Sequence, residues 1–256
     1  MGRKLAIGDI HGCLNSLKAL LEFVQPVASD KVIMLGDYVD RGPDSKGVID
    51  YLIDWPWDAK LILLKGNHEI IMDESGFSGD HLKYWCQVGG LDTIASYDAR
   101  FGNIPESHWE FIRNTLPYYE TGKVIYVHGG AAPKKPLVKQ DPVNLAWRRF
   151  SDAKEHSSGK LVVCGHTIQR KGKPNDKGHT VCIDTAACRG GWLTCFNPKT
   201  GRYWQANEQG QLRKRRLKAW KKKRAMKKMD SKIGISPLSI PHVPILLDTQ
   251  LFGIFK

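Results

Sequence analysis

Ligand-type side chains follow five short apolar runs of this sequence. The runs KLAIG, VIMLG, LILLKG, VIYV and LVVCG end at residues that could bind a metal ion: Asp9, His11, Asp37, Asn67, His128 and His166. Three oxygen donors and three imidazoles form a mixed set that suits Mn²⁺, Fe or Zn²⁺ better than Ca²⁺, and the set contains no soft thiolate. Six ligands exceed what one catalytic ion needs. They suit two ions roughly 3.5–4 Å apart that share one carboxylate.

Three further side chains lie next to these ligands in the sequence, namely Asp40, Arg41 and His68. The guanidinium of Arg41 presents a fork of donors that matches phosphate. His68, held by Asp40, could protonate a departing oxygen. A hydroxide bridging two cations could attack phosphorus in line, without a covalent intermediate. The residue types therefore favour metal-dependent hydrolysis of a phosphate ester.

The elements that must position these residues follow from the apolar periodicity. Runs of four to six aliphatic residues closed by glycine are typical of buried strands. Helical spacing over 15–25 and 44–54 separates the early runs, which predicts parallel strands with crossover helices. Ligands of such sheets bind beyond the carboxyl ends of the strands. We expect residues 81–114 to be helical with breaks at Gly89-Gly90 and Pro105, and 117–205 to be mostly strands and turns.

Composition excludes several classes of protein. The chain has 256 residues, 41% of them hydrophobic and 25% charged, which excludes a disordered chain and a disulfide-stapled miniprotein. No apolar run reaches 18 residues, so we expect no transmembrane helix, and the first residues lack the pattern of a signal peptide. The six cysteines follow no zinc spacing and are typical of reduced thiols. We therefore expect a cytoplasmic protein.

The positive charge is concentrated in one segment. The formal net charge is +13, and residues 213–228 contain 11 Lys and Arg and no acid, which leaves +2 for the rest. We therefore expect a catalytic domain over 1–210, a basic tail over 211–234 and an apolar, proline-containing extension over 235–256. The tail could contact RNA or another polyanion weakly, with Trp220 as a stacking residue. A solvated extension without a partner is the alternative.

Longer motifs carry a family resemblance. GDIHG, GDYVDRG, GNHE, HGG and GHT together resemble the metallophosphoesterases of the serine/threonine phosphoprotein phosphatase family, which are calcineurin-like. The stretch WCQVGGLDTIASY and the ending IDTAACRGGWLTCF are similar to the bacterial and phage branch. The resemblance covers about residues 3–205. It implies an α/β fold in which two mixed β-sheets are flanked by helices, an α-β-β-α sandwich.

The resemblance also implies roles, position by position. Asp9, His11 and Asp37 would hold one divalent ion, and Asp37, Asn67, His128 and His166 the other, with Mn²⁺ expected and Fe or Zn²⁺ as alternatives. His68 would be the general acid, oriented by Asp40. Phosphate contacts would come from Arg41, Asn67 and an arginine after Trp147, for which Arg149 matches better and Arg148 stays open. Two positions depart from the family: Lys65, where arginine is common, and Ala186, where glycine is usual.

The function implied is that of a metal-dependent phosphomonoesterase. We expect a protein serine/threonine phosphatase, and bacterial members of this branch often accept phosphotyrosine as well. The alternative is a symmetrical bis(5′-nucleosyl)-tetraphosphatase, whose catalytic motifs are the same. The segments 69–90 and 131–146, expected to rim the site, would decide between them. An alternative of another class is a nucleic-acid-associated protein that uses the basic tail.

Overall fold

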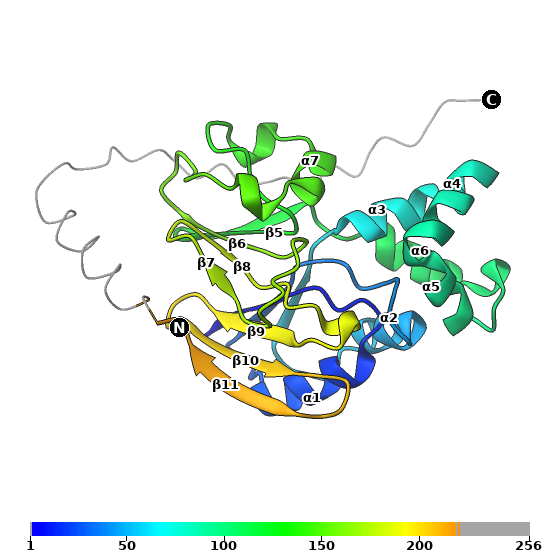
Figure 1. Ribbon diagram of the computed structural model, residues 1–256, viewed down its shortest axis with the longest axis horizontal. Helices are drawn as coiled ribbons and strands as arrows, with labels where there is room; N and C mark the ends of the chain where they lie inside the picture. Colours follow the sequence, from blue (N-terminus) through cyan, green and yellow to red (C-terminus); the bar gives the residue numbers. More distant parts are fainter. Residues whose placement is uncertain (1, 219, 221–256) are drawn as a thin grey trace, which may run out of the picture. The chain divides into compact units, whose positions relative to one another are not determined.

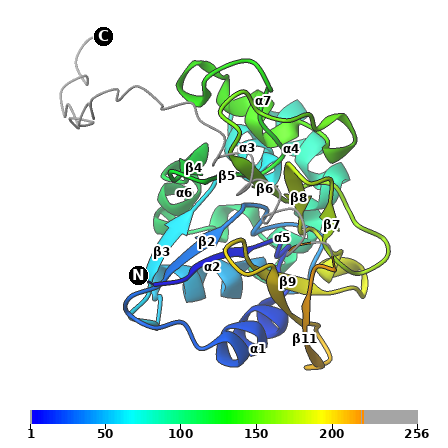
Figure 2. The same ribbon diagram turned by 90° about the vertical axis from the view of Figure 1, so that its left-hand side faces the viewer.

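Two β-sheets stacked between helices form the framework of the molecule (Figures 1 and 2). The computed structural model describes residues 2–218 and Trp220. A cluster of buried side chains between the sheets includes Ile33 of the first sheet and Val163 and Val181 of the second. The sandwich of two mixed sheets predicted from the sequence is therefore confirmed.

The first sheet has six strands in the order β11-β10-β9-β1-β2-β3. Its parallel part comprises β1 (Lys4–Ile7), β2 (Lys31–Met34) and β3 (Lys60–Leu63). Its antiparallel part comprises β9 (Leu193–Asn197), β10 (Arg202–Ala206) and β11 (Leu212–Arg216). Strand β1 joins the two parts, because it pairs with β2 on one side and with β9 on the other.

The crossover helices of this sheet are α1 (Leu14–Val24) and α2 (Ser45–Ile53), close to the two helical ranges predicted. Helix α1 buries a stripe that includes Leu17, Leu20 and Leu21, at the spacing of one helical face. The carboxylate of Asp44 caps α2 by accepting a hydrogen bond from Gly47 N at 2.7 Å. Both helices contribute to the main apolar core on the outer face of this sheet.

The second sheet has five strands in the order β4-β5-β6-β8-β7. They are β4 (Tyr118–Glu120), β5 (Val124–Val127), β6 (Leu161–Cys164), β7 (Asn175–Asp176) and β8 (Thr180–Cys182). Strands β5, β6 and β8 are parallel, and the two edge strands are antiparallel to them. Helix α7 (Pro142–Trp147) buries Leu145 in the apolar cluster that β5 and β6 also line.

A helical segment connects the two sheets. It consists of α3 (Asn67–Glu74), α4 (Gly79–Trp85), a π-helical turn (Cys86–Gly90), α5 (Leu91–Ser96) and α6 (Glu106–Arg113). Its helical backbone is interrupted at Gly89, whose φ is 130°, so the predicted break is confirmed. Short 3₁₀ turns occur at Phe101–Asn103, Leu137–Lys139, Phe150–Asp152 and Ala187–Arg189.

The basic segment begins differently from our expectation. Residues 212–216 form the edge strand β11 instead of the start of a tail, and Arg213 stacks 3.8 Å from the ring centroid of Trp192. Charged residues suit an edge strand because they discourage pairing with another chain. Trp220, expected to stack on a nucleic acid, is 9% exposed and packs edge-on against Phe196. The rest of the basic segment and the extension over 235–256 lie outside the described residues.

Two further expectations from the sequence concerned membrane-spanning helices and the state of the cysteines. Within residues 2–218, no helix is long and apolar enough to cross a bilayer. All six cysteines are free thiols, and Cys13, Cys164, Cys182 and Cys195 are buried. Cys13, two residues after His11, is therefore a packed thiol.

Candidate active site

Both sheets contribute residues to one polar centre. Asp9 and His11 follow β1, Asp37 follows β2, and Asn67 begins α3 just after β3, all in the first sheet. His128 follows β5 and His166 follows β6, in the second sheet. The carboxyl ends of the parallel strands meet here, which is where open α/β sheets place their ligands.

Short distances link all six predicted ligands. Asn67 Oδ1 lies 2.8 Å from His166 Nδ1 and 3.0 Å from His128 Nε2. Asp37 lies 3.3 Å from His128 Nε2 through Oδ1 and 3.4 Å from His11 Nε2 through Oδ2. Asp9 Oδ2 accepts a hydrogen bond from His166 N at 2.9 Å. The structure therefore brings together every ligand that the strand ends suggested.

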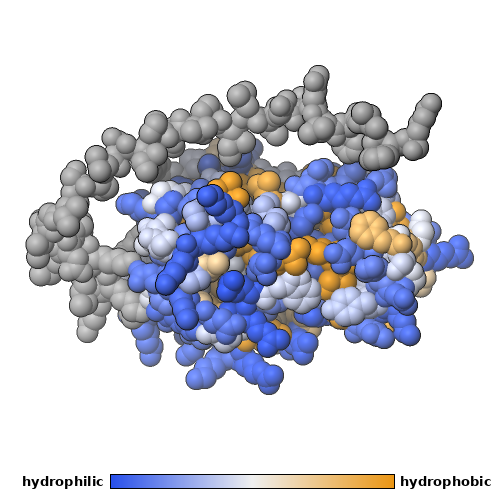
Figure 3. Space-filling model, turned by 90° about the horizontal axis from the view of Figure 1, so that it is seen from above, coloured by the Kyte–Doolittle hydropathy of each residue, from blue (hydrophilic) through white to orange (hydrophobic). Residues whose placement is uncertain are grey.

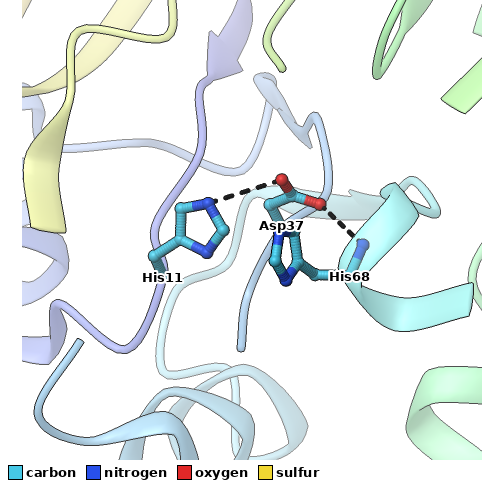
Figure 4. A group of neighbouring side chains, drawn as sticks. All are labelled: His11, Asp37 and His68. Atoms are coloured by element: carbon cyan, nitrogen blue, oxygen red, sulfur yellow. Dashed lines mark hydrogen bonds and ion pairs between the residues drawn. The ribbon is translucent and has the colours of Figure 1, made fainter. Parts of the chain in front are cut away.

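Two groups of donor atoms share Asp37. His11, Asp37 and His68 form one group, and Asp37, His128 and His166 form the other, with the donor atoms of each group within 4.8 Å of one another. Figure 4 shows Asp37 between His11 and His68. One carboxylate common to both groups is the arrangement that two neighbouring cations require.

The membership of the first group differs from the resemblance, which placed Asp9 with His11 and Asp37. The group of nearby donors contains His68 instead of Asp9, and His68 Nδ1 lies 2.6 Å from Asp40 Oδ2, so Nε2 is the ring nitrogen that this contact leaves unengaged. Asp9 Oδ1 is buried and accepts no hydrogen bond from the described residues. A buried carboxylate oxygen without a partner is costly, and a cation would satisfy it. The donors thus fit a metal centre that includes Asp9.

Backbone strain is concentrated at this centre. Five residues other than glycine have left-handed φ angles here: His11 at 47°, Asp37 at 55°, Asp40 at 73°, Arg41 at 68° and His166 at 62°. Such conformations cost on the order of 1 kcal/mol or more each and persist only where the surroundings enforce them. Clustering of this strain at one site is typical of functional loops.

Burial and charge set the protonation of the imidazoles. Burial lowers the pKa of His11 to about 3 and that of His166 to about 4, so both are neutral at pH 7, the form that binds metals. Burial opposes the charged form of His128 too, but the charge of Asp37 raises its pKa to about 10. Burial likewise disfavours ionised Asp37, yet the charges of His128 and His68 hold its pKa well below the usual range. A bound cation would stabilise the ionised carboxylate of Asp37 in place of the proton on His128.

Three arginines differ in their relation to the centre. Arg41 Nη1 lies 3.2 Å from His11 Nε2. Arg148 and Arg149 both have extended backbone, so their side chains point to opposite sides. Burial and the charge of His128 lower the pKa of His166 most, and the charge of Arg149 lowers it further. The aliphatic part of the Arg148 side chain packs against Gly130 instead. Arg149 therefore lies close enough to the centre for its charge to act on His166.

Sequence reasoning missed several residues around the centre. Glu69 is fully buried and accepts hydrogen bonds from the backbone of Asp37, Tyr38 and Gly66. Asp184 is buried, which raises its pKa to about 6, and its charge also acts on Asp9. The motifs GNHE and IDTA contain these two acids, but spacing along the chain does not show which backbone groups they face. Ala186, where the family usually has glycine, has a left-handed φ of 65°.

The remaining histidines lie elsewhere. His108 contacts Tyr97 and Asp50, and His156 contacts Ser158. His81 and His179 hydrogen-bond with neighbouring hydroxyls. None of these four belongs to either donor group, and His242 lies outside the described residues.

A comparison with protein families matches residues 2–189 to the calcineurin-like phosphoesterases. Among curated proteins, the symmetrical bis(5′-nucleosyl)-tetraphosphatase of Legionella pneumophila strain Lens is 31% identical over 135 residues, which is 52% of this chain and 46% of that protein. The enzyme of the same name from Pseudomonas entomophila is 30% identical over 135 residues, 52% of this chain and 45% of that protein. The chain thus spans about half the length of the curated relatives it matches.

Solved structures share the fold at low sequence identity. A putative diadenosine tetraphosphatase superposes with a TM-score of 0.58 and 20% identity, covering 84% of this chain and 93% of that one. The cold-active protein-tyrosine phosphatase of a Shewanella species gives 0.56 and 16%, covering 84% and 80%. A serine/threonine phosphatase from Saccharomyces cerevisiae gives 0.55 and 15%, covering 77% and 73%. At these identities the likeness concerns the fold alone.

Proposed function

The chain belongs to the calcineurin-like phosphoesterases, and we propose that within this family it hydrolyses the phosphate chain of dinucleoside tetraphosphates. The observation that carries the reaction class is the pair of donor groups that share Asp37. The substrate class rests on the curated relatives, which are named symmetrical tetraphosphatases at 30–31% identity. This reverses the order of the two functions expected from the motifs.

The proposed metal ligands are the six residues at the strand ends: Asp9, His11, Asp37, Asn67, His128 and His166. Neutral imidazoles at His11 and His166 and the unpartnered Oδ1 of Asp9 support this set. Two divalent cations, with Mn²⁺ the first to test, would supply an acidified water and neutralise charge on the phosphate. The donor chemistry equally admits Fe and Zn²⁺.

The remaining steps belong to side chains of the protein. Arg41 and Arg149 would hold the phosphate from two sides, because a guanidinium matches phosphate oxygens in a bidentate manner. Nδ1 of His68 is held by Asp40, so Nε2 is the atom that can carry a proton toward the departing oxygen. Asp40 is completely buried, which keeps the orientation of His68 fixed.

A protein phosphatase remains the second candidate. Trp147 lies 6.0 Å from His166, ring centroid to ring centroid, and is 39% exposed, so an aromatic side chain beside the centre is accessible from solvent. An accessible aromatic side chain beside the centre suits contact with a phosphorylated side chain on the surface of another protein. The face of the molecule over α7 is mostly hydrophilic, with small separate apolar patches (Figure 3).

A substrate panel in Mn²⁺ tests the proposal. It compares diadenosine tetraphosphate with phosphoserine, phosphothreonine and phosphotyrosine peptides, with Asp37→Asn as the inactive control. We expect kcat/KM at least about 10-fold higher for the tetraphosphate, and ADP as its only nucleotide product, because symmetrical cleavage gives two equal halves. A preference for the phosphopeptides would instead establish the second candidate. Turnover of none of them would reject both.

A further inference from the structure

Residues 85–93 approach the loop that carries Asp40 and Arg41. This stretch runs from the end of α4 through the π-helical turn into α5. Gly89 O accepts a hydrogen bond from Arg41 N at 3.1 Å, and Val88 O accepts one from Arg41 Nε at 3.3 Å. The stretch therefore helps to hold the left-handed backbone at Asp40 and Arg41.

The carboxylate of Asp40 is fully engaged by this stretch and by His68. Oδ1 accepts hydrogen bonds from Thr93 Oγ1 at 2.7 Å and from Trp85 Nε1 at 2.9 Å. Oδ2 lies 2.6 Å from His68 Nδ1, and the same indole N–H of Trp85 also reaches it at 3.1 Å. Because all four side chains are buried, no water competes for these bonds. The two donors on Oδ1 fix the rotation of the carboxylate and thereby direct Oδ2 at His68.

The hydroxyl of Thr93 has a second contact with the same residue. It accepts a hydrogen bond from Asp40 N at 2.8 Å while donating to Asp40 Oδ1, so it bridges the backbone and the carboxylate. Ser45 Oγ lies 2.9 Å from the Thr93 hydroxyl and 3.0 Å from Asp40 N. Removing the Thr93 hydroxyl would therefore remove one hydrogen bond from the backbone of Asp40 and one from its carboxylate.

Two glycines permit this close approach. A Cβ on Gly89 would lie 2.7 Å from Arg41 Cγ, and the φ of Gly89 is 130°. A Cβ on Gly90 would lie 2.5 Å from the Trp85 ring. Both distances are too short for a side chain, so the pattern of a tryptophan, two glycines and a threonine in this stretch has a geometric reason.

We propose that Trp85 and Thr93 are positioning residues for proton transfer, acting on His68 through Asp40. This inference rests on the proposed function, in which His68 protonates the leaving oxygen. Mutating the outer partners that orient metal-binding histidines typically costs about 10–100-fold in activity or metal affinity, and we expect a loss of similar size when these hydrogen bonds are removed. Neither side chain needs to contact substrate for this effect.

The first test uses Thr93→Val, which keeps the shape and removes the hydroxyl. We expect kcat to fall at least about 10-fold on an alkyl phosphate, whose leaving oxygen needs a proton, and less than about 3-fold on para-nitrophenyl phosphate, which leaves readily. Thr93→Ser should restore the alkyl phosphate rate. Trp85→Phe, which removes only the indole donor, should show the same selectivity more weakly. Thr115→Val is the matched control, because Thr115 is buried and its hydroxyl donates to Ile112 O.

A second readout does not depend on turnover. In the full chain loaded with Mg²⁺ or Zn²⁺, the proton between His68 Nδ1 and Asp40 should give a downfield NMR resonance, assigned by its loss in His68→Asn. Thr93→Val should shift or broaden this resonance, and Thr115→Val should not. If Thr93→Val and Trp85→Phe lower the rates on the alkyl phosphate and on para-nitrophenyl phosphate equally and leave the resonance unchanged, Trp85 and Thr93 contribute only to packing. If the wild type hydrolyses no phosphate ester, the proposed function fails, and the resonance still decides whether Thr93 positions Asp40.

Discussion

The carboxylate of Glu69 holds the backbone of Asp37. Its Oε2 accepts a hydrogen bond from Asp37 N at 2.7 Å and another from Gly66 N at 2.8 Å, while Oε1 accepts from Tyr38 N at 2.8 Å. The loop after β2 is thereby tied to the first turn of α3. Since Asp37 belongs to both donor groups, the geometry of the whole centre depends on a residue that is not itself a predicted ligand.

Glu69→Gln should destabilise the fold. The amide has one acceptor oxygen, so its NH₂ group would face a backbone N–H and leave that donor unsatisfied. We expect the free energy of unfolding to fall by about 2–3 kcal/mol, measured in urea. Glu74→Gln in the same helix is exposed and should change it by less than about 0.5 kcal/mol. Equal effects of the two changes would contradict this role of Glu69.

Removal of metal should abolish activity. Chelation should stop turnover of para-nitrophenyl phosphate and Mn²⁺ should restore it, because the charge on the phosphate would otherwise be uncompensated. Asp37→Asn should lose both bound metal, measured by elemental analysis, and turnover. Exposed Asp58 is the control, and Asp58→Asn should keep both. A metal-free preparation with full activity would exclude the two-ion centre.

His68→Asn should separate the roles of acid and ligand. As a general acid, His68 contributes about 10²–10⁴ to kcat on an alkyl phosphate. The defect should be smaller on para-nitrophenyl phosphate, and metal content should stay at the wild-type level. Because His68 lies in one donor group, the opposite result is informative: lost metal together with equal defects on both substrates would make it a ligand.

Arg149→Ala should lower kcat/KM about 10-fold or more and weaken inhibition by inorganic phosphate, because charge-assisted contacts contribute about 1.5–3 kcal/mol. Arg148→Ala is the matched control, since its side chain points to the other side of the same extended backbone. We expect its effect on phosphate inhibition to be below 2-fold, in line with about 0.3 kcal/mol. The reverse pattern would show that the phosphate contact lies one residue earlier.

Truncation should separate the edge strand from the residues that follow. Ending the chain after Gln211 would remove β11 and Trp220, and loss of the buried indole alone should cost about 3 kcal/mol or more. Ending it after Trp220 should preserve the melting temperature and the turnover of small esters. RNA binding by the basic residues stays a prediction. It would appear as a salt-dependent mobility shift of the full chain that the chain ending after Trp220 lacks.

Local patterns predicted the parts of the structure that depend on local sequence. The apolar runs and their closing glycines predicted the strands that precede Asp9, Asp37 and His166. A parallel strand that is buried on both faces has a nearly continuous run of aliphatic residues, which is easy to recognise in a sequence. Helix α2 and the interruption at Gly89 were predicted for similar reasons.

The misses share one cause, which is contact between residues distant in sequence. Strand β11 carries the sequence LRKRR and has no apolar pattern, and only its pairing with β10 makes it a strand. The hydrogen bond from Thr93 to Asp40 spans 53 residues, and its partners cannot be paired by spacing. Glu69 was visible in GNHE, but its role appears only when the loop after β2 lies beside it.

Ligands drawn from both sheets have a consequence for the lifetime of the protein. An ion bound by Asp37 and His128 would cross-link the two layers, much as a covalent bridge would. Binding only to the folded state would stabilise the protein by about 2.7 kcal/mol at a free metal concentration 100 times the dissociation constant. Metal supply in the cell would then govern not only how fast each molecule works but how many molecules escape proteolysis.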